Sequence, residues 1–257
     1  MRVHIIGGGN LGVAMAKGIV KKSPEIHVSV SRRNIQLIQH LKLLGVSITS
    51  DNNKFIPEAD LVILSVKPFQ VTAVLAEIKE NLRGKIIASA VTGFSLSELR
   101  EATESLCSLV RIMPNIAVEF GESATCIAHQ GENAAGVTIV QDLFQRLGTA
   151  LVIEEKLMDA ATVLGACGTA YALRYIRASM QAGIEIGFDA ATAMAIASQT
   201  VKGAAKLALE ENTHPEQLID RVTTPQGCTI VGLNEMEHQG FSSALIRGIK
   251  TSLDKIK

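Results

Sequence analysis

Three glycines near the start of the chain, Gly7, Gly9 and Gly12, have the spacing G-x-G-x-x-G. They follow an apolar strand expected over residues 3–6 and open an amphipathic helix expected over residues 10–21. In that setting the glycines permit a tight turn, close approach of a pyrophosphate and packing of the helix on the strand. The helix would point its free N–H groups at the phosphates. A turn without a ligand is the alternative. The dinucleotide-binding candidates are Gly7, Gly9, Asn10, Leu11 and Gly12.

The end of the second expected strand, residues 26–30, indicates which dinucleotide is bound. An acid about 20 residues after the glycines would bind the ribose of NAD, whereas an arginine there would suit the 2′-phosphate of NADP. The strand is followed by Ser31, Arg32 and Arg33, and the next acid is Asp51. Two guanidinium groups and a hydroxyl match a phosphate in geometry and charge. The pattern favours NADP over NAD, with a solvated basic turn as the alternative.

A loop near the C-terminus is a second candidate binding site. Pro225 and Gly227 do not fit a helix interior, but residues 230–237 have a helical pattern. Cys228 and Thr229 are therefore expected at a helix N-terminus, where unpaired N–H groups bind a small carboxylate. The alternative is that Thr229 only caps its own helix, and these residues alone do not decide between the two.

The elements that must position these residues divide the chain into two parts. Strands and helices alternate as far as residue 153, which is the pattern of a mainly parallel sheet covered on both faces. Beyond that point only helical patterns follow, and the small residues of a helix expected over 190–211 allow a partner to approach closely. We expect an α/β Rossmann-type domain over residues 1–154. An all-α domain shared between two subunits is expected over residues 155–257.

The individual elements follow from hydrophobic periodicity and from glycine, proline and capping signals. The strands are expected over residues 3–6, 26–30, 46–48, 61–66, 85–90, 106–112, 123–129 and 150–153. The main helices are expected over residues 10–21, 35–44, 133–147, 154–166, 168–186, 190–211 and 230–237.

The amino-acid composition and net charge argue against several classes of function. Of the 257 residues, 47% are hydrophobic and 19% charged, which supports a packed core. A formal net charge of +0 and the lack of a long apolar run argue against nucleic-acid and membrane binding. The 4 cysteines and 6 histidines lack metal-binding spacing, so no metal is expected. Because the sequence opens on a strand, we expect no targeting segment and a cytoplasmic protein with reduced thiols.

The chain resembles the pyrroline-5-carboxylate reductase family, in order and over essentially its whole length. The segments that carry the resemblance are Gly7–Gly12, Ser65–Pro68, Arg111–Asn115, Ala166–Tyr171 and Thr224–Phe241. The last of these is the most specific. The family has a similar layout, with an NADP-type Rossmann domain followed by an all-helical domain that interleaves into a homodimer, and many members build larger rings of dimers.

The resemblance implies the last step of proline biosynthesis, the NADPH-dependent reduction of the cyclic imine 1-pyrroline-5-carboxylate to L-proline. It implies that Thr229 is the catalytic residue, hydrogen-bonded near the ring nitrogen, and that the backbone around Gly227 and Cys228 receives the substrate carboxylate. An iminium substrate can arrive already protonated, so no catalytic histidine or aspartate is required. The cofactor-lining residues that the resemblance adds are Ser65, Val66, Lys67 and Pro68, with Asn53 as a weaker candidate.

Two positions depart from the family pattern. Thr169 stands where the family usually has proline, and Gln226 stands where it usually has glycine. If position 226 needs a positive φ, glutamine costs about 1 kcal/mol of strain there. If it does not, the glutamine adds an amide at the mouth of the site.

These departures leave two alternatives open. The first is a related NADPH-dependent imine or keto-acid reductase, and the second is a non-catalytic NADP-binding protein. Hydroxyisobutyrate-type dehydrogenases share the two-domain plan but use a lysine on the interdomain helix. This chain has Arg174 and Arg177 on that helix, which speaks against their chemistry.

Overall fold

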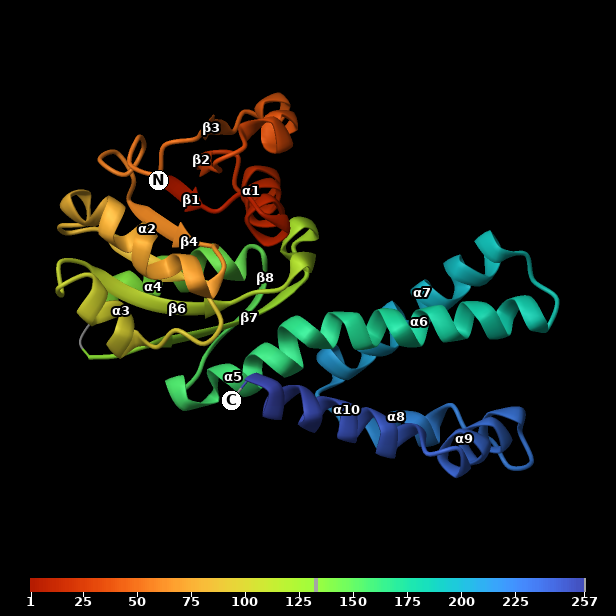
Figure 1. Cartoon of the computed structure of the whole chain (residues 1–257). Helices are drawn as coiled ribbons and strands as arrows, with labels where there is room; N and C mark the ends of the chain where they lie inside the picture. Colours follow the sequence, from red (N-terminus) through yellow and green to blue (C-terminus); the bar gives the residue numbers. More distant parts are fainter. Residues whose placement is uncertain (132–133, 257) are drawn as a thin grey trace. The chain divides into compact units, whose positions relative to one another are not determined.

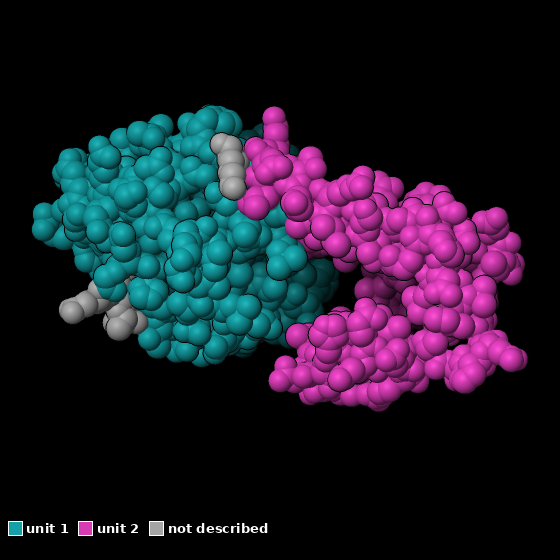
Figure 2. Space-filling model, turned by 90° about the horizontal axis from the view of Figure 1, so that it is seen from below, with its two compact units in different colours: residues 1–167, 256 teal, residues 168–255, 257 magenta. Residues whose placement is uncertain are grey.

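The computed structural model describes residues 1–131 and 134–256, and Figure 1 shows the order of its elements. The chain forms two compact units, one of residues 1–167 with Ile256 and one of residues 168–255. Figure 2 shows the two units in different colours. Residues 155–167, which the sequence assigns to the second domain, pack with the first unit. A functional boundary at residue 154 stays a prediction.

The first unit is built on an 8-stranded sheet with the order β3-β2-β1-β4-β5-β6-β7-β8. Its strands are β1 (Arg2–Ile6), β2 (His27–Ser31), β3 (Ser47–Thr49), β4 (Leu61–Leu64), β5 (Ile86–Ser89), β6 (Ser108–Met113), β7 (Ser123–His129) and β8 (Gly148–Val152). Neighbouring strands run parallel except β6 and β7, so the expected mainly parallel sheet is confirmed. The strand order reverses between β1 and β4, which is where doubly wound sheets bind ligands.

Helical segments connect these strands. The α-helices of the first unit are α1 (Asn10–Lys22), α2 (Val71–Ile78), α3 (Leu96–Ala102), α4 (Ala134–Gln145) and α5 (Met158–Ala161). The 3₁₀ segments are η1 (Ile35–Leu44), η2 (Pro68–Gln70), η3 (Lys79–Asn81), η4 (Ile116–Phe120) and η5 (Glu155–Leu157), and η6 (Thr162–Cys167) is a π-helix.

Three expected helices differ from the structure. Residues 35–44 form a 3₁₀-helix between an Asn34 side-chain cap and a left-handed Gly45. Its buried residues, Ile38 and Leu41, are three positions apart, a spacing that both an α-helix and a 3₁₀-helix allow. Residues 154–166 are not one helix but a succession of 3₁₀, α and π turns. The helix expected over 133–147 starts at Asn133, which lies outside the described residues, and Gly148 already belongs to β8.

The sheet is covered on both faces because side chains alternate along its strands. On one face Ile5 of β1 packs with residues of α1 and α4, and on the other Ile6 packs with residues of α2 and α3. Both isoleucines are at most 1% exposed. Burying a side chain of this size contributes about 1.5–3 kcal/mol, and this packing fixes the carboxyl end of β1, where the glycine turn begins.

The second unit is helical. It contains α6 (Gly168–Glu185), α7 (Ala190–Glu211), α8 (Pro215–Arg221), α9 (Cys228–His238) and most of α10 (Phe241–Ile256). A Cβ on Gly183 of α6 would come within 2.9 Å of the Cβ of Ala193 on α7, so these helices pack closely. The hydroxyls of Tyr171 on α6 and Ser252 on α10 are 2.7 Å apart and hydrogen-bonded.

A single copy of this unit leaves most of its apolar surface uncovered. Of the described residues 168–255, Ala193 and Ala197 are the only buried hydrophobic ones. Ile186 and Leu209 are 76% and 77% exposed, respectively. Side chains of this kind are normally buried, so an exposed set of this extent indicates a surface that another polypeptide covers. None of the described helices is long and apolar enough to cross a membrane.

Candidate active site

The glycine turn after β1 has the geometry that a dinucleotide site needs. Gly7 has φ +109°, and a Cβ there would lie 2.3 Å from the carbonyl oxygen of Ser65. A Cβ on Gly12 would lie 2.1 Å from the carbonyl oxygen of Gly7. Both positions therefore require glycine. At Gly9, by contrast, no heavy atom of the described residues lies within 4 Å of the position that a Cβ would take, so the backbone is open to a ligand.

The N-terminus of α1 lies directly behind this opening. Asn10 is the first residue of the helix and is exposed, while Leu11 packs against the core. The N-cap is Gly9, and among the described residues no side chain caps this end and no acid stands in the first turn. Because the first N–H groups of a helix lack intrahelical partners, this end can accept an anion. These residues fit the pyrophosphate of a dinucleotide.

The end of β2 is attached to the glycine turn through the backbone. The N–H groups of Gly7 and Gly8 both donate to the carbonyl oxygen of Ser31, at 3.1 and 3.0 Å. The Ser31 side chain is fully buried, and its hydroxyl donates to Oδ1 of Asn52 at 2.7 Å. The structure thus buries this hydroxyl beneath the surface, and the part of Ser31 in binding the 2′-phosphate stays a prediction.

The two arginines after β2 differ in their surroundings. Nη1 of Arg32 donates to the carbonyl oxygen of Gly8 at 2.5 Å, and the side chain is half-buried. Arg33 is exposed, and in the described part of the chain it has no hydrogen-bond or ion-pair partner. The Arg32 guanidinium lies at the glycine turn and Arg33 follows it in the chain, and among the described residues neither is paired with an acid, which suits a phosphate. Their role in binding the 2′-phosphate stays a prediction.

The segment after β4 meets the glycine turn from the other side. The carbonyl of Ser65 and the Cγ1 of Val66 lie nearest to a Cβ placed on Gly7, at 2.3 and 3.0 Å. Lys67 is exposed and is the N-cap of η2, which Pro68 begins. The structure therefore brings all four of these residues to the reversal point between β1 and β4. That is the position predicted for cofactor-lining residues, although their contacts with a cofactor stay a prediction.

Asn53 is held by the protein itself. Its Nδ2 donates to the carbonyl oxygen of Glu77 at 3.1 Å, and its Oδ1 accepts from Nδ2 of Asn81 at 2.8 Å. Each polar end of the side chain makes a hydrogen bond within the protein, and a part for Asn53 in cofactor binding stays a prediction. The neighbouring Asn52 contacts Ser31, a connection that local pattern did not reveal because its partner is distant in sequence.

In the second unit, the loop before α9 is a tight turn. The N–H of Gly227 donates to the carbonyl oxygen of Thr224 at 2.9 Å, and Gln226 has φ +60°. Proline at the second position and a positive φ at the third define a type II turn. Position 226 therefore does need a positive φ, and glutamine is strained there. A Cβ on Gly227 would lie 2.4 Å from Oγ1 and 3.0 Å from the carbonyl oxygen of Thr224, so a larger residue there would require the Thr224 side chain to move.

The N-terminus of α9 resembles that of α1. Cys228 is exposed and is the first helical residue, Thr229 is the second, and the N-cap is Gly227. The alternative in which Thr229 is the N-cap is therefore wrong, because the turn places a glycine at that position. Among the described residues no side chain caps this end and no acid lies in its first turn. The N–H groups around Cys228 and Thr229 are thus available to a carboxylate.

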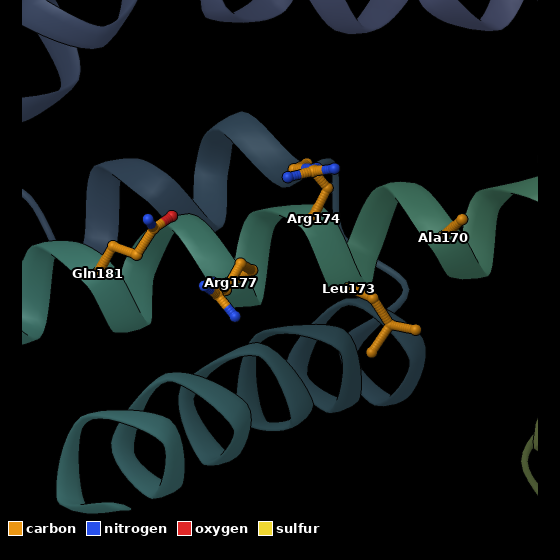
Figure 3. Close-up of a pocket in the computed structure, with 5 residues that line it drawn as sticks. All are labelled: Ala170, Leu173, Arg174, Arg177 and Gln181. Carbon is orange, nitrogen blue, oxygen red and sulfur yellow. The ribbon is translucent and has the colours of Figure 1, made fainter. Parts of the chain in front are cut away.

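One face of α6 forms a shallow hollow of about 480 Å³ (Figure 3). It is lined by Ala170, Leu173, Arg174, Arg177 and Gln181. All of these residues belong to a single helix, so the hollow is open on the side opposite α6. Neither arginine has a hydrogen-bond or ion-pair partner within the described ranges. Thr169 stands in the first turn of α6, where the family's proline is missing.

The described residues contain no group of three or more histidine, cysteine, aspartate or glutamate residues that could hold a metal ion. The one strongly shifted histidine is His4, which is buried within the sheet and hydrogen-bonded to Ser29 and to the backbone of Asn52. Burial lowers its pKa to about 4, so it is neutral near pH 7.

Comparison with known proteins identifies both units. A family described as pyrroline-5-carboxylate reductase dimerisation matches residues 155–257. A family described as NADP oxidoreductase coenzyme F420-dependent matches residues 2–93. Pyrroline-5-carboxylate reductase 1 of Dictyostelium discoideum is 43% identical over 98% of this chain, which spans 49% of that relative. The chain is thus about half as long as this relative.

Two further proteins match over nearly their whole length. Pyrroline-5-carboxylate reductase 2 of Dictyostelium discoideum is 40% identical over 98% of this chain and 91% of its own. The crystal structure of Plasmodium falciparum pyrroline carboxylate reductase with NADP bound superposes with a TM-score of 0.88 and 26% identity, covering 100% of this chain and 97% of that one. The chain therefore belongs to the pyrroline-5-carboxylate reductase family.

Proposed function

We propose that the protein catalyses the NADPH-dependent reduction of 1-pyrroline-5-carboxylate to L-proline. The observation that carries the proposal is the pair of open helix N-termini at α1 and α9. Each begins at a glycine N-cap, and each lacks a side-chain cap among the described residues. The N-termini of α3 and α7 are instead capped by Ser95 and Asp189. Those of α2 and α5 also lack a side-chain cap, but they continue directly from the 3₁₀ segments η2 and η5. The uncapped ends of α1 and α9 provide one site for a pyrophosphate and one for a carboxylate.

The first unit supplies the NADP site. The α1 N-terminus and the open backbone at Gly9 hold the pyrophosphate, while Arg32 and Arg33 hold the 2′-phosphate. Ser65, Val66, Lys67 and Pro68 line the cofactor toward its nicotinamide end. When bound, NADPH supplies the hydride that reduces the imine carbon.

The second unit supplies the substrate site. The N–H groups around Gly227 and Cys228 bind the substrate carboxylate, and the hydroxyl of Thr229 hydrogen-bonds the ring nitrogen. This bond orients the iminium and remains available to the amine that forms. The protein then needs no acid–base pair of its own, and its main contribution is to hold the imine in a reactive orientation, which lowers the barrier by proximity.

We expect the active protein to be a homodimer of two copies of this chain. The helices of the second unit expose many large apolar side chains, and the hollow on α6 is open on one side. A homodimer formed through these helices would cover that surface, and the family match to residues 155–257 supports this partner. Light scattering at micromolar concentration should give a dimer, and a fully active monomer would contradict the assignment. A cytoplasmic location stays a prediction.

The substrate-altered reductase remains the second candidate, because Gln226 places an amide on a strained turn beside the carboxylate site. Following NADPH oxidation with 1-pyrroline-5-carboxylate and with its six-membered homologue separates the two. Faster turnover of the five-membered imine supports the proposed function. Preference for the homologue favours the second candidate, and cofactor binding without turnover of any cyclic imine would leave a non-catalytic NADP-binding protein.

A further inference from the structure

We propose that His4 is a positioning residue for the 2′-phosphate end of the NADP site, because it holds the loop of residues 50–53 against the end of β2. The inference rests on the proposed function, in which Arg32 and Arg33 bind the 2′-phosphate. His4 does not touch the cofactor itself. It acts through a set of hydrogen bonds that passes through Asn52 to Ser31, the residue directly before the two arginines.

The first hydrogen bonds of this set are those of the His4 imidazole ring. His4 lies on β1 and is 0% exposed. Its Nε2 is 3.2 Å from the carbonyl oxygen of Asn52, and its Nδ1 is 2.8 Å from the hydroxyl oxygen of Ser29. A carbonyl oxygen only accepts, so Nε2 carries the proton and donates, and Nδ1 accepts from the Ser29 hydroxyl. The ring of Phe55 lies beside the imidazole, with 5.8 Å between ring centroids.

The next hydrogen bonds are those of the Asn52 side chain. Its Oδ1 accepts from the Ser31 hydroxyl at 2.7 Å, and its Nδ2 donates to Oε2 of Glu77 at 3.0 Å. The carbonyl of Ser31 in turn accepts from Gly7 and Gly8 of the glycine turn. The N–H of Arg32 donates to the carbonyl oxygen of Thr49, the last residue of β3, at 2.9 Å, so the backbone of the first arginine is bonded to the residue directly before this loop.

This placement indicates a role beyond packing. An aliphatic side chain would fill a buried strand position without needing partners, whereas a buried imidazole is costly unless it is hydrogen-bonded. The partner of Nε2 is a loop carbonyl, so the conformation of the loop depends on His4. Without this donor the loop loosens, and the two arginines are no longer held ready for a phosphate. NADH has no 2′-phosphate, so its binding should change little.

Equilibrium binding of NADPH and of NADH to the full chain tests the inference, with nicotinamide fluorescence as the readout. His4→Leu should weaken NADPH binding about tenfold, the effect of one lost hydrogen bond to a charged subsite, and NADH binding less than about threefold. His4→Gln keeps a donor at the place of Nε2 and should retain most of the selectivity. His27→Gln is the matched control, because His27 is an exposed histidine on β2 outside this set.

A second variant keeps the test decisive if His4→Leu does not fold. Asn52→Ala breaks the contact with Ser31 from a half-buried loop position and should cause the same selective loss of NADPH binding. Equal losses for both cofactors, or an unchanged ratio in a folded variant, would overturn the role of His4 and leave the proposed function standing. If the unmodified protein binds NADPH and NADH equally, the 2′-phosphate subsite is absent and the inference fails with it.

Discussion

Arg32 and Gly8 are joined by a hydrogen bond of 2.5 Å from Nη1 to the backbone carbonyl oxygen. The first residue after β2 thereby holds its guanidinium over the turn that follows β1. In the described part of the chain this is the one hydrogen bond of that guanidinium, which has five N–H donors, so others remain for a ligand. The backbone of Ser31 reinforces the same connection by accepting from Gly7 and Gly8.

Replacing both arginines tests their assignment to the 2′-phosphate. The Arg32→Ala, Arg33→Ala double variant should raise the KM for NADPH at least tenfold, because charge-assisted bonds to a phosphate contribute about 1.5–3 kcal/mol. The KM for NADH should change much less. Arg83→Ala removes an exposed arginine elsewhere in the first unit and serves as the control. Equal effects on the two cofactors would remove the 2′-phosphate role.

The strain at Gln226 predicts a stabilising substitution. Gln226 has a φ of +60° in the type II turn, which strains a residue with a Cβ. Gln226→Gly removes this strain and should stabilise the protein by about 1 kcal/mol. For a chain of this size that corresponds to a melting temperature higher by roughly 2–4 °C. Gln226→Ala keeps the strain and is the control. Thermal melts at one protein concentration measure both, and a lower melting temperature for the glycine variant would show that the glutamine side chain makes stabilising contacts.

The buried His4 makes stability depend on pH. Its pKa is lowered from 6.5 to about 4 by burial, opposed by hydrogen bonds to Asn52 and Ser29 and by the charge of Asp51. Between these values the unfolded chain binds a proton that the folded chain does not, so stability rises with pH. This contribution to the free energy of unfolding is fully present above pH 6.5 and is lost as the pH falls toward 4. It amounts to roughly 3 kcal/mol.

Chemical denaturation at a series of pH values from 4 to 6.5 measures this contribution. The protein concentration must stay fixed, because subunit association also contributes to stability. His4→Gln cannot take up a proton in this range and should show a shallower dependence on pH. If the unmodified protein and the variant have the same slope, His4 does not titrate as its burial requires.

The hydroxyl of Thr229 is predicted to act on the substrate. Thr229→Val keeps the shape of the side chain and should lower kcat/KM about tenfold to a hundredfold, with NADPH binding unchanged. Thr229→Ser should retain most of the activity. Because Gly227 is the N-cap of α9, the valine should cost little stability. A valine variant that melts early but turns over normally would instead assign Thr229 a structural role.

The sequence predicted the features that local chemistry determines. The glycine spacing identified Gly7 and Gly12 as positions where a side chain would collide with the backbone, and the alternating β and α patterns identified the sheet. The pattern could not distinguish an α-helix from a 3₁₀-helix over residues 35–44, because the spacing of three between the buried Ile38 and Leu41 is allowed in both. The antiparallel pairing of β6 and β7 depends on tertiary contacts and was not predicted.

Features of the site that depend on distant partners could not be predicted. Ser31 belongs to the expected phosphate-binding set, but its hydroxyl faces Asn52 because the loop after β3 folds over the end of β2. His4 lies in an apolar strand, and its partners Ser29 and Asn52 are far away in sequence. The N-cap at Gly227 depends on the turn geometry, which the residue types alone left open.

Steady-state oxidation of NADPH with 1-pyrroline-5-carboxylate, with proline identified as the product, tests the central claim most directly. NADPH should be consumed in equal amount to the proline formed, and NADH should be a poorer cofactor at the same concentration. The Thr229→Val variant in the same assay should bind NADPH normally and form proline more slowly. Tight NADPH binding without proline formation by the unmodified dimer would contradict the assigned reaction.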